Sequence, residues 1–324
     1  MPEYTMAQAI NQGLRHSLDS DDRVLVLGED VGKLGGVFRV TEGLQEEFGS
    51  KRVFDTPLAE SAIAGVSIGL CLYGFKPVAE MQFDAFMFPA FNQIVTHAAK
   101  YRNRTQGRSS VSMVVRVPFA GGIGSAELHS ESPEAYFAHT SGLKVVVPAG
   151  PLDAFDLLVA SISDPDPVLF FEPKSRYWSK EIGELGSSPL PLGKARVVRE
   201  GDACTLIAYG AMVPRSLEAA QAAAEDGVEV EVIDLRTLVP FDLETVSASV
   251  AKTGRAIVVH EAPLTAGFGA EVAARVTEEV FLSLEAPILR VTGYDVPYPP
   301  AKIERYYVPS IDRILTAIDR VLGF

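Results

Sequence analysis

Two patterns of apolar residues alternate along the chain, one with the period of a helix and one with the continuous runs of buried strands. The first helix is predicted from Thr5, because Thr5 and Gln8 have capping-box spacing and apolar residues then recur at helical intervals to Leu18. Another helix is predicted over 61–73. Strands are predicted at 24–27, 53–54, 77–83, 111–117, 144–147 and 168–172. Apolar strands separated by helices predict a doubly wound α/β domain with a mostly parallel sheet.

The segment 179–193 has a different composition, rich in Gly, Ser and Pro and poor in large apolar residues, which is typical of a linker. The alternation restarts after it, with a last amphipathic helix from Ser310. Strands in this second half are predicted at 204–209, 228–235, 256–259 and 288–291. We therefore expect two domains, residues 1–185 and a smaller α/β unit over 186–324.

Composition removes several classes of function. The chain of 324 residues has a formal net charge of -13, which argues against non-specific binding to nucleic acid. Its longest apolar stretch, 62–75, is shorter than the roughly 20 residues of a spanning helix, so we expect no membrane insertion. The N-terminus lacks the basic and apolar regions of a secretory signal, which predicts a cytoplasmic protein. Walker A, GxGxxG, HExxH and CxxC motifs do not occur.

Candidate chemistry lies at the ends of predicted strands and in a Gly-rich loop. Glu29 and Glu60 follow strands, where ligands collect in parallel sheets. His129 lies in a polar loop after Gly121, Gly122 and Gly124, and a histidine there can exchange protons near neutral pH. Four phenylalanines occur between 83 and 91, one of which could stack on a flat heterocycle. Each feature alone also has an ordinary structural explanation.

Ordered motifs together give a more specific indication. The chain resembles the beta subunit of thiamine-dependent 2-oxo acid dehydrogenases, collinearly from about Thr5 to the C-terminus. The motifs are LGEDVG (27–32), GGVFRVTEGL (35–44), DTPLAES (55–61), AEMQFDAF (79–86), HSESPEA (129–135), GLKVVVP (142–148) and VTGYDVPYP (291–299). The resemblance implies a pyrimidine-binding domain of transketolase type followed by a domain of the transketolase C-terminal type.

The resemblance also implies a cofactor and partners. Two alpha and two beta chains would form the enzyme, with thiamine diphosphate between alpha and beta. The alpha chain would hold the diphosphate and Mg²⁺, which agrees with the lack of a Gly-Asp-Gly segment followed by Asn in this chain. A lipoyl-bearing dihydrolipoyl acyltransferase would receive the acyl group. A chain without its alpha partner is then expected to be inactive.

Site residues follow from the same resemblance, position by position. Glu60 matches the glutamate that bonds to a pyrimidine nitrogen and activates the coenzyme, and His129 matches the histidine that assists acyl transfer. Cofactor contacts are expected from Glu29, Leu58, Ala59, Glu60, Gln82 and Phe86. Substrate contacts are expected from Phe83, Phe86, Pro89, His129 and Glu131. A structural monovalent cation, such as potassium, is expected near Ser161, Asp164 and Asp166.

The substrate is less specified than the family. The motifs GGVFRVTEGL and EPKSRYW favour branched-chain 2-oxo acids such as 3-methyl-2-oxobutanoate, with pyruvate as the second candidate. Leu128 stands where several branched-chain members carry a second histidine, so a role for that histidine is not expected here. A non-catalytic scaffold subunit and a transketolase-like half-protein are two further possible functions. Glu60 and His129 argue against the scaffold, and the spellings HSESPEA and DTPLAES argue against the half-protein.

Overall fold

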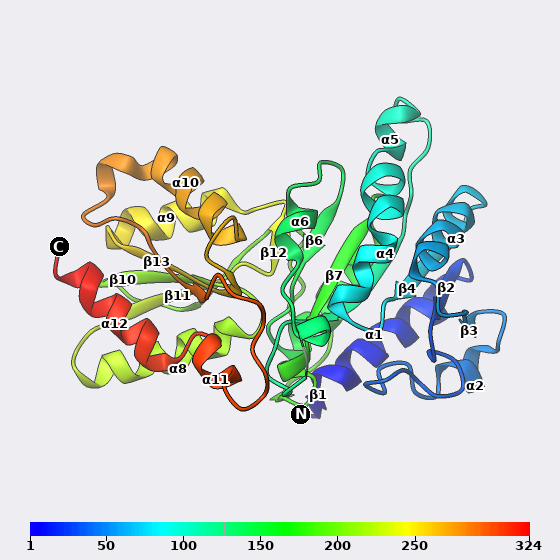
Figure 1. Ribbon diagram of the computed structural model, residues 1–324, viewed down its shortest axis with the longest axis horizontal. Coiled ribbons are helices and arrows are strands. Elements are labelled where there is room, and N and C mark those ends of the chain that lie inside the picture. Colours follow the sequence, from blue (N-terminus) through cyan, green and yellow to red (C-terminus); the bar gives the residue numbers. More distant parts are fainter. Residues whose placement is uncertain (126) are drawn as a thin grey trace.

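Seven strands form the sheet of the N-terminal half in the computed structural model, which describes residues 1–125 and 127–324 (Figure 1). Their order is β12-β6-β7-β5-β4-β2-β3, and every neighbouring pair is parallel except β12 with β6. The strands are β2 (Val24–Gly28), β3 (Val53–Asp55), β4 (Lys76–Glu80), β5 (Val114–Phe119), β6 (Lys144–Val146), β7 (Val168–Pro173) and β12 (Thr237–Val239).

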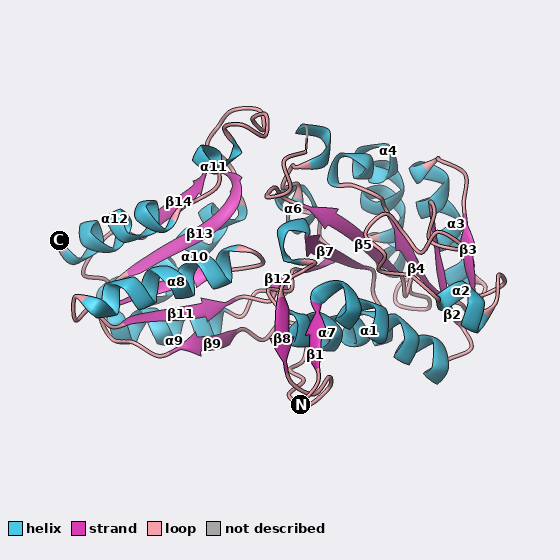
Figure 2. Ribbon diagram, turned by 90° about the horizontal axis from the view of Figure 1, so that it is seen from below, coloured by secondary structure: helices cyan, strands magenta, loops and turns pink. Residues whose placement is uncertain are grey.

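Helices cover both faces of this sheet, and its central strands are therefore completely buried (Figure 2). On one face α1 (Met6–Ser20) packs against α7 (Pro151–Ser163), together with Val24 and Val26 of β2. The other face carries α3 (Glu60–Leu72), α4 (Met87–Asn92), a π-helical turn (Gln93–Ala98) and α5 (Tyr101–Arg104). Shorter elements are α2 (Leu44–Phe48), α6 (Glu134–Ala138) and 3₁₀ turns at Asp84–Phe86, Glu127–His129 and Lys174–Arg176.

The C-terminal half contains a five-stranded sheet in the order β14-β13-β10-β11-β9, parallel except for β9. Its strands are β9 (Arg196–Arg199), β10 (Cys204–Ala208), β11 (Val230–Asp234), β13 (Ala256–Pro263) and β14 (Leu289–Gly293). Its helices are α8 (Met212–Glu225), α9 (Leu243–Thr253), α10 (Phe268–Val280), α11 (Glu304–Tyr307) and α12 (Ile311–Leu322), with a 3₁₀ turn at Phe281–Ser283. None of the helices in the described part of the chain is long and apolar enough to cross a membrane.

The two halves are joined by more than a linker. Strand β12 leaves the C-terminal half and becomes the edge strand of the first sheet, where Thr237 pairs with Val146. The N-terminal strand β1 (Glu3–Thr5) pairs with β8 (Lys180–Ile182), which lies inside the segment expected to be a linker. One apolar cluster also runs from α3 and α4 to β11, β13 and α10. The halves therefore share a core, and their contact surface is part of the fold.

Most predicted elements are found, with shifted ends. Thr5 is the N-cap of α1 and forms the reciprocal capping box with Gln8, and Ser310 caps α12. The doubly wound α/β class is confirmed. The strand predicted over 111–117 is found as β5, but it begins three residues later, at Val114, where pairing with β4 and β7 starts. Strands β1, β8, β9 and β12 were not predicted, because pairing with a distant partner forms them.

Candidate active site

Three neighbouring strands of the first sheet end at the same edge and deliver three candidate polar side chains. Glu29 follows β2 directly, Glu60 begins α3 after β3, and Gln82 follows β4. The backbone N–H of Thr56 donates to the carbonyl oxygen of Gly28 at 2.9 Å, which ties the exits of β3 and β2 together. Because β4, β2 and β3 are adjacent, these side chains converge although they are far apart in the sequence.

Glu29 and Glu60 are both buried, and they lie close enough for their charges to interact. Burial raises the pKa of the Glu29 carboxyl, and the charges of Glu60 and then Asp30 raise it further. The Glu29 atom Oε1 and the Thr56 atom Oγ1 are buried without a hydrogen-bond partner in the described structure. Buried polar atoms are normally paired, so each of these two atoms is available for a hydrogen bond to a polar ligand.

Gln82 completes this polar edge. Its Nε2 donates to the Asp30 carboxylate at 3.1 Å and lies 3.5 Å from the Glu29 carbonyl oxygen. Ala59 is partly buried beside Glu60 as the N-cap residue of α3, whereas Leu58 has 79% of its surface exposed. The sequence-predicted residues Glu29, Glu60 and Gln82 are thus brought together, and Leu58 projects from the edge of the group.

An aromatic group forms the second part of the site. The rings of Phe83 and His129 meet edge to face, with centroids 4.2 Å apart. Phe86 lies 5.3 Å from His129 and 5.8 Å from Phe83 in similar geometry. All three side chains are partly exposed, so the group is open to a ligand. The imidazole is therefore held by aromatic contacts, without a hydrogen bond to its ring in the described structure.

A buried ion pair supports this aromatic group. The Lys174 ammonium donates to the carboxylate of Asp84, which lies between Phe83 and Phe86 in the chain, and both charged side chains are inaccessible. Burial raises the pKa of Asp84 to about 6 although Lys174 opposes the shift, and burial lowers the pKa of Lys174. Lys174 also lies over the Phe83 ring at 5.9 Å. The pair fixes the 3₁₀ turn that carries both phenylalanines.

A second buried network crosses three strands beneath the site. Arg116 of β5 donates two hydrogen bonds to the Glu172 carboxylate of β7, at 2.7 and 2.9 Å, and one to Glu80 of β4 at 2.7 Å. The Tyr177 hydroxyl donates to Glu172 at 2.6 Å. Burial raises the pKa of Glu80. Burial would lower the pKa of Arg116, but the two carboxylates raise it above its usual value. This network joins β4, β5 and β7, of which β4 leads to Gln82 and β5 leads to the loop that carries His129.

Two residues expected to contact the substrate, Pro89 and Glu131, lie at the edge of the aromatic group. Pro89 is exposed on α4, after the aromatic turn. Glu131 is partly buried, and its carbonyl oxygen accepts from the Ala120 N–H at 2.8 Å, which closes the base of the loop that carries His129. Burial raises the pKa of Glu131, and Glu127 adds to the shift.

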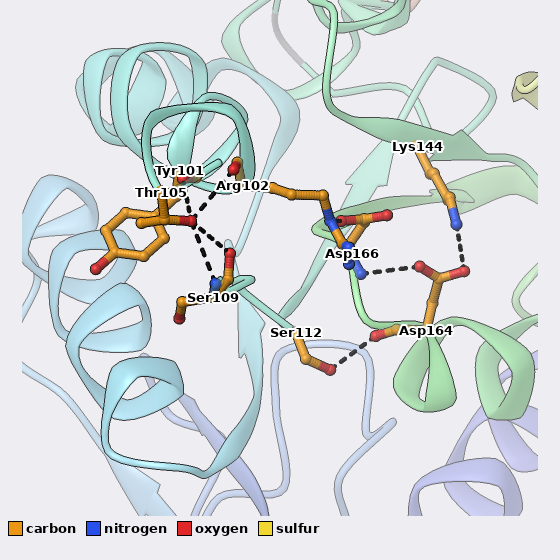
Figure 3. Close-up of polar contacts among 8 residues, drawn as sticks. All are labelled: Tyr101, Arg102, Thr105, Ser109, Ser112, Lys144, Asp164 and Asp166. Atoms are coloured by element: carbon orange, nitrogen blue, oxygen red, sulfur yellow. Dashed lines mark hydrogen bonds and ion pairs between the residues drawn. The ribbon is translucent and has the colours of Figure 1, made fainter. Parts of the chain in front are cut away.

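The expected cation residues lie at the opposite end of the sheet from Glu29 and Glu60. Figure 3 shows Asp164 and Asp166 with Lys144 and Arg102. Asp164 and Asp166 precede β7, next to Lys144 at the start of β6. The Lys144 ammonium donates to the Asp164 carboxylate, and the Arg102 guanidinium donates to Asp166. Ser161 donates back to its own helix, 2.6 Å from the Leu157 carbonyl oxygen. Protein cations therefore pair with these carboxylates, and a monovalent cation beside them stays a prediction from the resemblance.

No cluster of three or more potential His, Cys, Asp or Glu ligands for a metal occurs among residues 1–125 and 127–324. A groove of about 630 Å³ between β14 and α12 contains none of the candidate residues.

The contact between the halves contains a buried carboxyl group near the site. Glu134 at the start of α6 is fully buried, and the Tyr209 hydroxyl donates to its Oε1 at 2.7 Å. Its Oε2 has no partner in the described structure. Burial raises the pKa of Glu134 to about 7, which the Tyr209 bond only partly opposes.

Glu134→Gln is expected to remove a pH dependence of stability. The folded pKa, about 7, exceeds the ordinary 4.5, so folding favours the protonated acid. That contribution is complete below about pH 4.5 and is lost as the pH rises to about 7, a change of about 3 kcal/mol. Denaturant unfolding at about pH 5 and pH 7.5 measures it, with Glu278→Gln on the exposed side of α10 as the control. The raised pKa of Glu134 would be contradicted if the free energy of unfolding changed with pH equally in wild type and in Glu134→Gln.

Several supporting residues were not predicted as site residues, namely Glu80, Asp84, Arg116, Glu134, Glu172 and Lys174. A signal for some of them exists in the sequence. Arg116 lies inside the apolar run VVRVPF and Glu172 ends the run VLFFE, and charged residues in buried strands imply partners. The partners themselves come from neighbouring strands, and only the sheet order identifies them.

Comparisons with known proteins agree on one family. The family described as transketolase, pyrimidine binding domain, matches residues 2–179, and that described as transketolase, C-terminal domain, matches residues 193–314. The pyruvate dehydrogenase E1 component subunit beta of Leifsonia xyli subsp. xyli is 54% identical over 98% of this chain and 95% of its own length. The 3-methyl-2-oxobutanoate dehydrogenase subunit beta of Mycobacterium tuberculosis is 52% identical over 98% of this chain and 92% of its own length.

A solved structure extends the likeness to the fold. A split-gene transketolase, described as an inactive beta4 tetramer, superposes with a TM-score of 0.83 over 98% of both chains. Its sequence identity to this chain is 23%, so the likeness concerns the architecture.

Proposed function

The chain belongs to the beta subunits of the thiamine diphosphate-dependent 2-oxo acid dehydrogenases, and we propose that Glu60 is its activating carboxyl group. The observation that carries the proposal is the group of Glu60, Glu29 and Thr56 at the adjoining ends of β2 and β3. Glu60 is buried at the first turn of α3, and its charge acts on Glu29. Oε1 of Glu29 and Oγ1 of Thr56, four residues before Glu60, are buried without a hydrogen-bond partner in the described structure. That arrangement fits a flat, nitrogen-rich ring.

The residues present fit the aminopyrimidine of thiamine diphosphate. Glu60 would hold a proton at a ring nitrogen, and Glu29 would keep the local charge balance by its raised pKa. Phe86 would lie against the ring, with Leu58, Ala59 and Gln82 at its edge. When bound, thiamine diphosphate supplies the carbon nucleophile and the electron sink for decarboxylation of the 2-oxo acid.

We assign His129 to the later transfer of the acyl group to a lipoyl group. Its ring is partly exposed and has no hydrogen bond in the described structure, so it is free to donate a proton to an incoming sulfur or oxygen. Phe83 and Phe86 fix the orientation of the imidazole through ring contacts. Pro89 and Glu131 would border the path of the substrate.

The alpha subunit is the proposed partner that completes the site, in a complex of two alpha and two beta chains. The diphosphate and Mg²⁺ would be held by that chain. Helix α3 leads away from Glu60 with an uncharged surface, on which Val66 is 51% exposed and Tyr73, just after the helix, is 86% exposed. An apolar helix face beside a site is the kind of surface that another chain covers. A dihydrolipoyl acyltransferase would take the product, and the cytoplasm is the location that the sequence predicts.

The proposed substrate is a branched-chain 2-oxo acid such as 3-methyl-2-oxobutanoate. The second candidate is pyruvate, favoured by the name of the Leifsonia relative at 54% identity, against 52% for the Mycobacterium one. The difference of two per cent does not separate them, so the proposal follows the motifs GGVFRVTEGL and EPKSRYW.

Co-expression with the alpha chain encoded for this complex is expected to give a decarboxylating enzyme, whereas the beta chain alone should have no measurable turnover. Turnover of 3-methyl-2-oxobutanoate and of pyruvate on the purified assembly then ranks the substrates by kcat/KM. We expect at least about tenfold preference for the branched acid, the size of effect that two extra methyl groups have in an apolar pocket. A preference for pyruvate would reverse the substrate proposal, and an inactive assembly would support a non-catalytic scaffold.

A further inference from the structure

The loop that carries His129 is attached to the second half of the chain at its start. We propose that Glu261 and Glu304 are positioning residues, which hold the His129 loop (the described residues 120–125 and 127–131) in place for acyl transfer. The inference rests on the proposed function of His129. It assigns to the C-terminal half a task in the active site of the N-terminal half.

Two adjacent backbone amides of the loop are bound by two carboxylates from separate elements. The N–H of Gly121 donates to Oε2 of Glu261 on β13 at 3.1 Å, and the N–H of Gly122 donates to Oε1 of Glu304 on α11 at 2.9 Å. Tyr298 donates its hydroxyl to the same Glu304 oxygen at 2.7 Å, which orients that carboxylate. Hydrogen bonds to an ionised acceptor are about twice as strong as neutral ones and strongly directional.

Packing adds to these bonds. A Cβ atom at Gly121 would lie 1.6 Å from the Tyr298 hydroxyl, and one at Gly122 would lie 2.6 Å from Cβ of Ser175. Gly122 also has a φ of +93°, a conformation that residues other than glycine rarely adopt. Gly121 is therefore packed closely against Tyr298 of the C-terminal half, and Gly122 lies against the Lys174–Arg176 turn of the N-terminal half.

The far end of the loop is fixed by the site itself. The Ala120 amide donates to the Glu131 carbonyl oxygen at 2.8 Å and closes the base of the loop. His129 lies against Phe83 and Phe86, and Tyr209 of the C-terminal half holds Glu134 just beyond the loop. Since His129 follows Gly122 by only seven residues, we expect release of the anchored start of the loop to widen the range of positions that the imidazole takes.

The hydrogen bond from Gly121 to Glu261 is shielded from water, so water cannot readily replace the acceptor. This side chain is buried, and burial raises its pKa while the Gly121 amide opposes the shift. Removing the carboxyl group leaves a buried N–H without its acceptor, which weakens the anchor. Glutamine at the same position keeps an acceptor oxygen, so it should preserve most of the anchor.

Amide hydrogen exchange of the full chain tests the anchor without any catalytic assay. In Glu261→Ala and Glu304→Ala we expect the exchange of the Gly121 and Gly122 amides to rise at least about tenfold, as for a lost charged hydrogen bond. Glu261→Gln should keep most of the protection. Glu278→Ala, which removes an exposed glutamate of the same half, is the matched control. Unchanged exchange in both alanine variants would overturn the proposal.

Partial reactions of the enzyme assembled with its alpha chain test the functional part. Both alanine variants are expected to slow reductive acylation of a lipoyl group at least about tenfold, since displacements near 1 Å have effects of this size or larger. Decarboxylation followed with an artificial electron acceptor should fall much less, and Glu261→Gln should recover most of the acyl transfer. Equal losses in both reactions would overturn the positioning role and indicate a general structural one.

The proposed function can fail separately. Normal acyl transfer by His129→Ala would refute the role of His129. The exchange experiment would then still decide whether Glu261 and Glu304 hold the loop.

Discussion

Glu60→Gln is expected to lower the rate of 2-oxo acid decarboxylation at least about 10²-fold in the enzyme assembled with its alpha chain, the range of general acid–base effects. Glutamine has the size of glutamate and can accept a hydrogen bond, but it cannot take up or release a proton. Helix α3 begins at this residue and its core contacts come from later positions such as Ile63 and Ala64, so the fold should persist. Steady-state turnover with an artificial electron acceptor measures the loss.

Glu46→Gln is a suitable control because Glu46 is an exposed glutamate on α2, on the same half of the chain. It should retain wild-type turnover. Spectroscopic titration of Glu60→Gln with thiamine diphosphate measures how tightly the variant binds the coenzyme. This measurement separates a loss of coenzyme binding from a loss of coenzyme activation. Near-normal decarboxylation by the variant would refute the assignment of Glu60 and leave the family membership untouched.

Arg116→Met is expected to reduce the free energy of unfolding by about 3–5 kcal/mol, the cost of breaking a buried ion pair from one side. The guanidinium lies between Glu80 and Glu172, and all three side chains are almost inaccessible. Methionine fills most of the space but leaves two buried carboxyl groups without their cation. Denaturant unfolding monitored by circular dichroism measures the change.

The destabilisation should depend on pH in a defined direction. The pKa of Glu80 is already raised by burial, and loss of Arg116 would raise it further. A folded pKa above the unfolded value means that stability falls as the pH rises between the two, so the variant should be least impaired near pH 4.5 and more impaired at neutral pH. Arg23→Met, which breaks the exposed pair with Asp21, should have a much smaller effect. If the loss of stability in Arg116→Met did not change with pH, the assignment of a raised pKa to the buried Glu80 carboxyl would be wrong.

Local patterns predicted a large part of this protein because they depend on neighbours in sequence. The capping box of Thr5 and Gln8 and the apolar period of α1 require no distant partner. The continuous apolar runs of β2, β5 and β7 follow from burial on both faces of a parallel sheet. Glu29 and Glu60 were found for a related reason, since ligands collect where such strands end.

The sequence also determined the functional family, through the residues and the order of motifs such as DTPLAES and HSESPEA. The residues that support the site required the tertiary structure. Arg116 finds Glu80 and Glu172 only because β4, β5 and β7 are neighbours in the sheet. Gly121 and Gly122 meet carboxylates that lie 140 and 182 residues further along the chain.

Sequence by itself therefore determined most of the α/β elements and the family, and it supplied the candidate site residues. Tertiary structure decided which buried charges pair, that β12 crosses into the first sheet, and that the C-terminal half holds the His129 loop. The physical reason is the separation in sequence of the residues that interact. Helix caps and apolar periods are set by residues a few positions apart, whereas buried ion pairs and backbone anchors form between segments that only folding brings together.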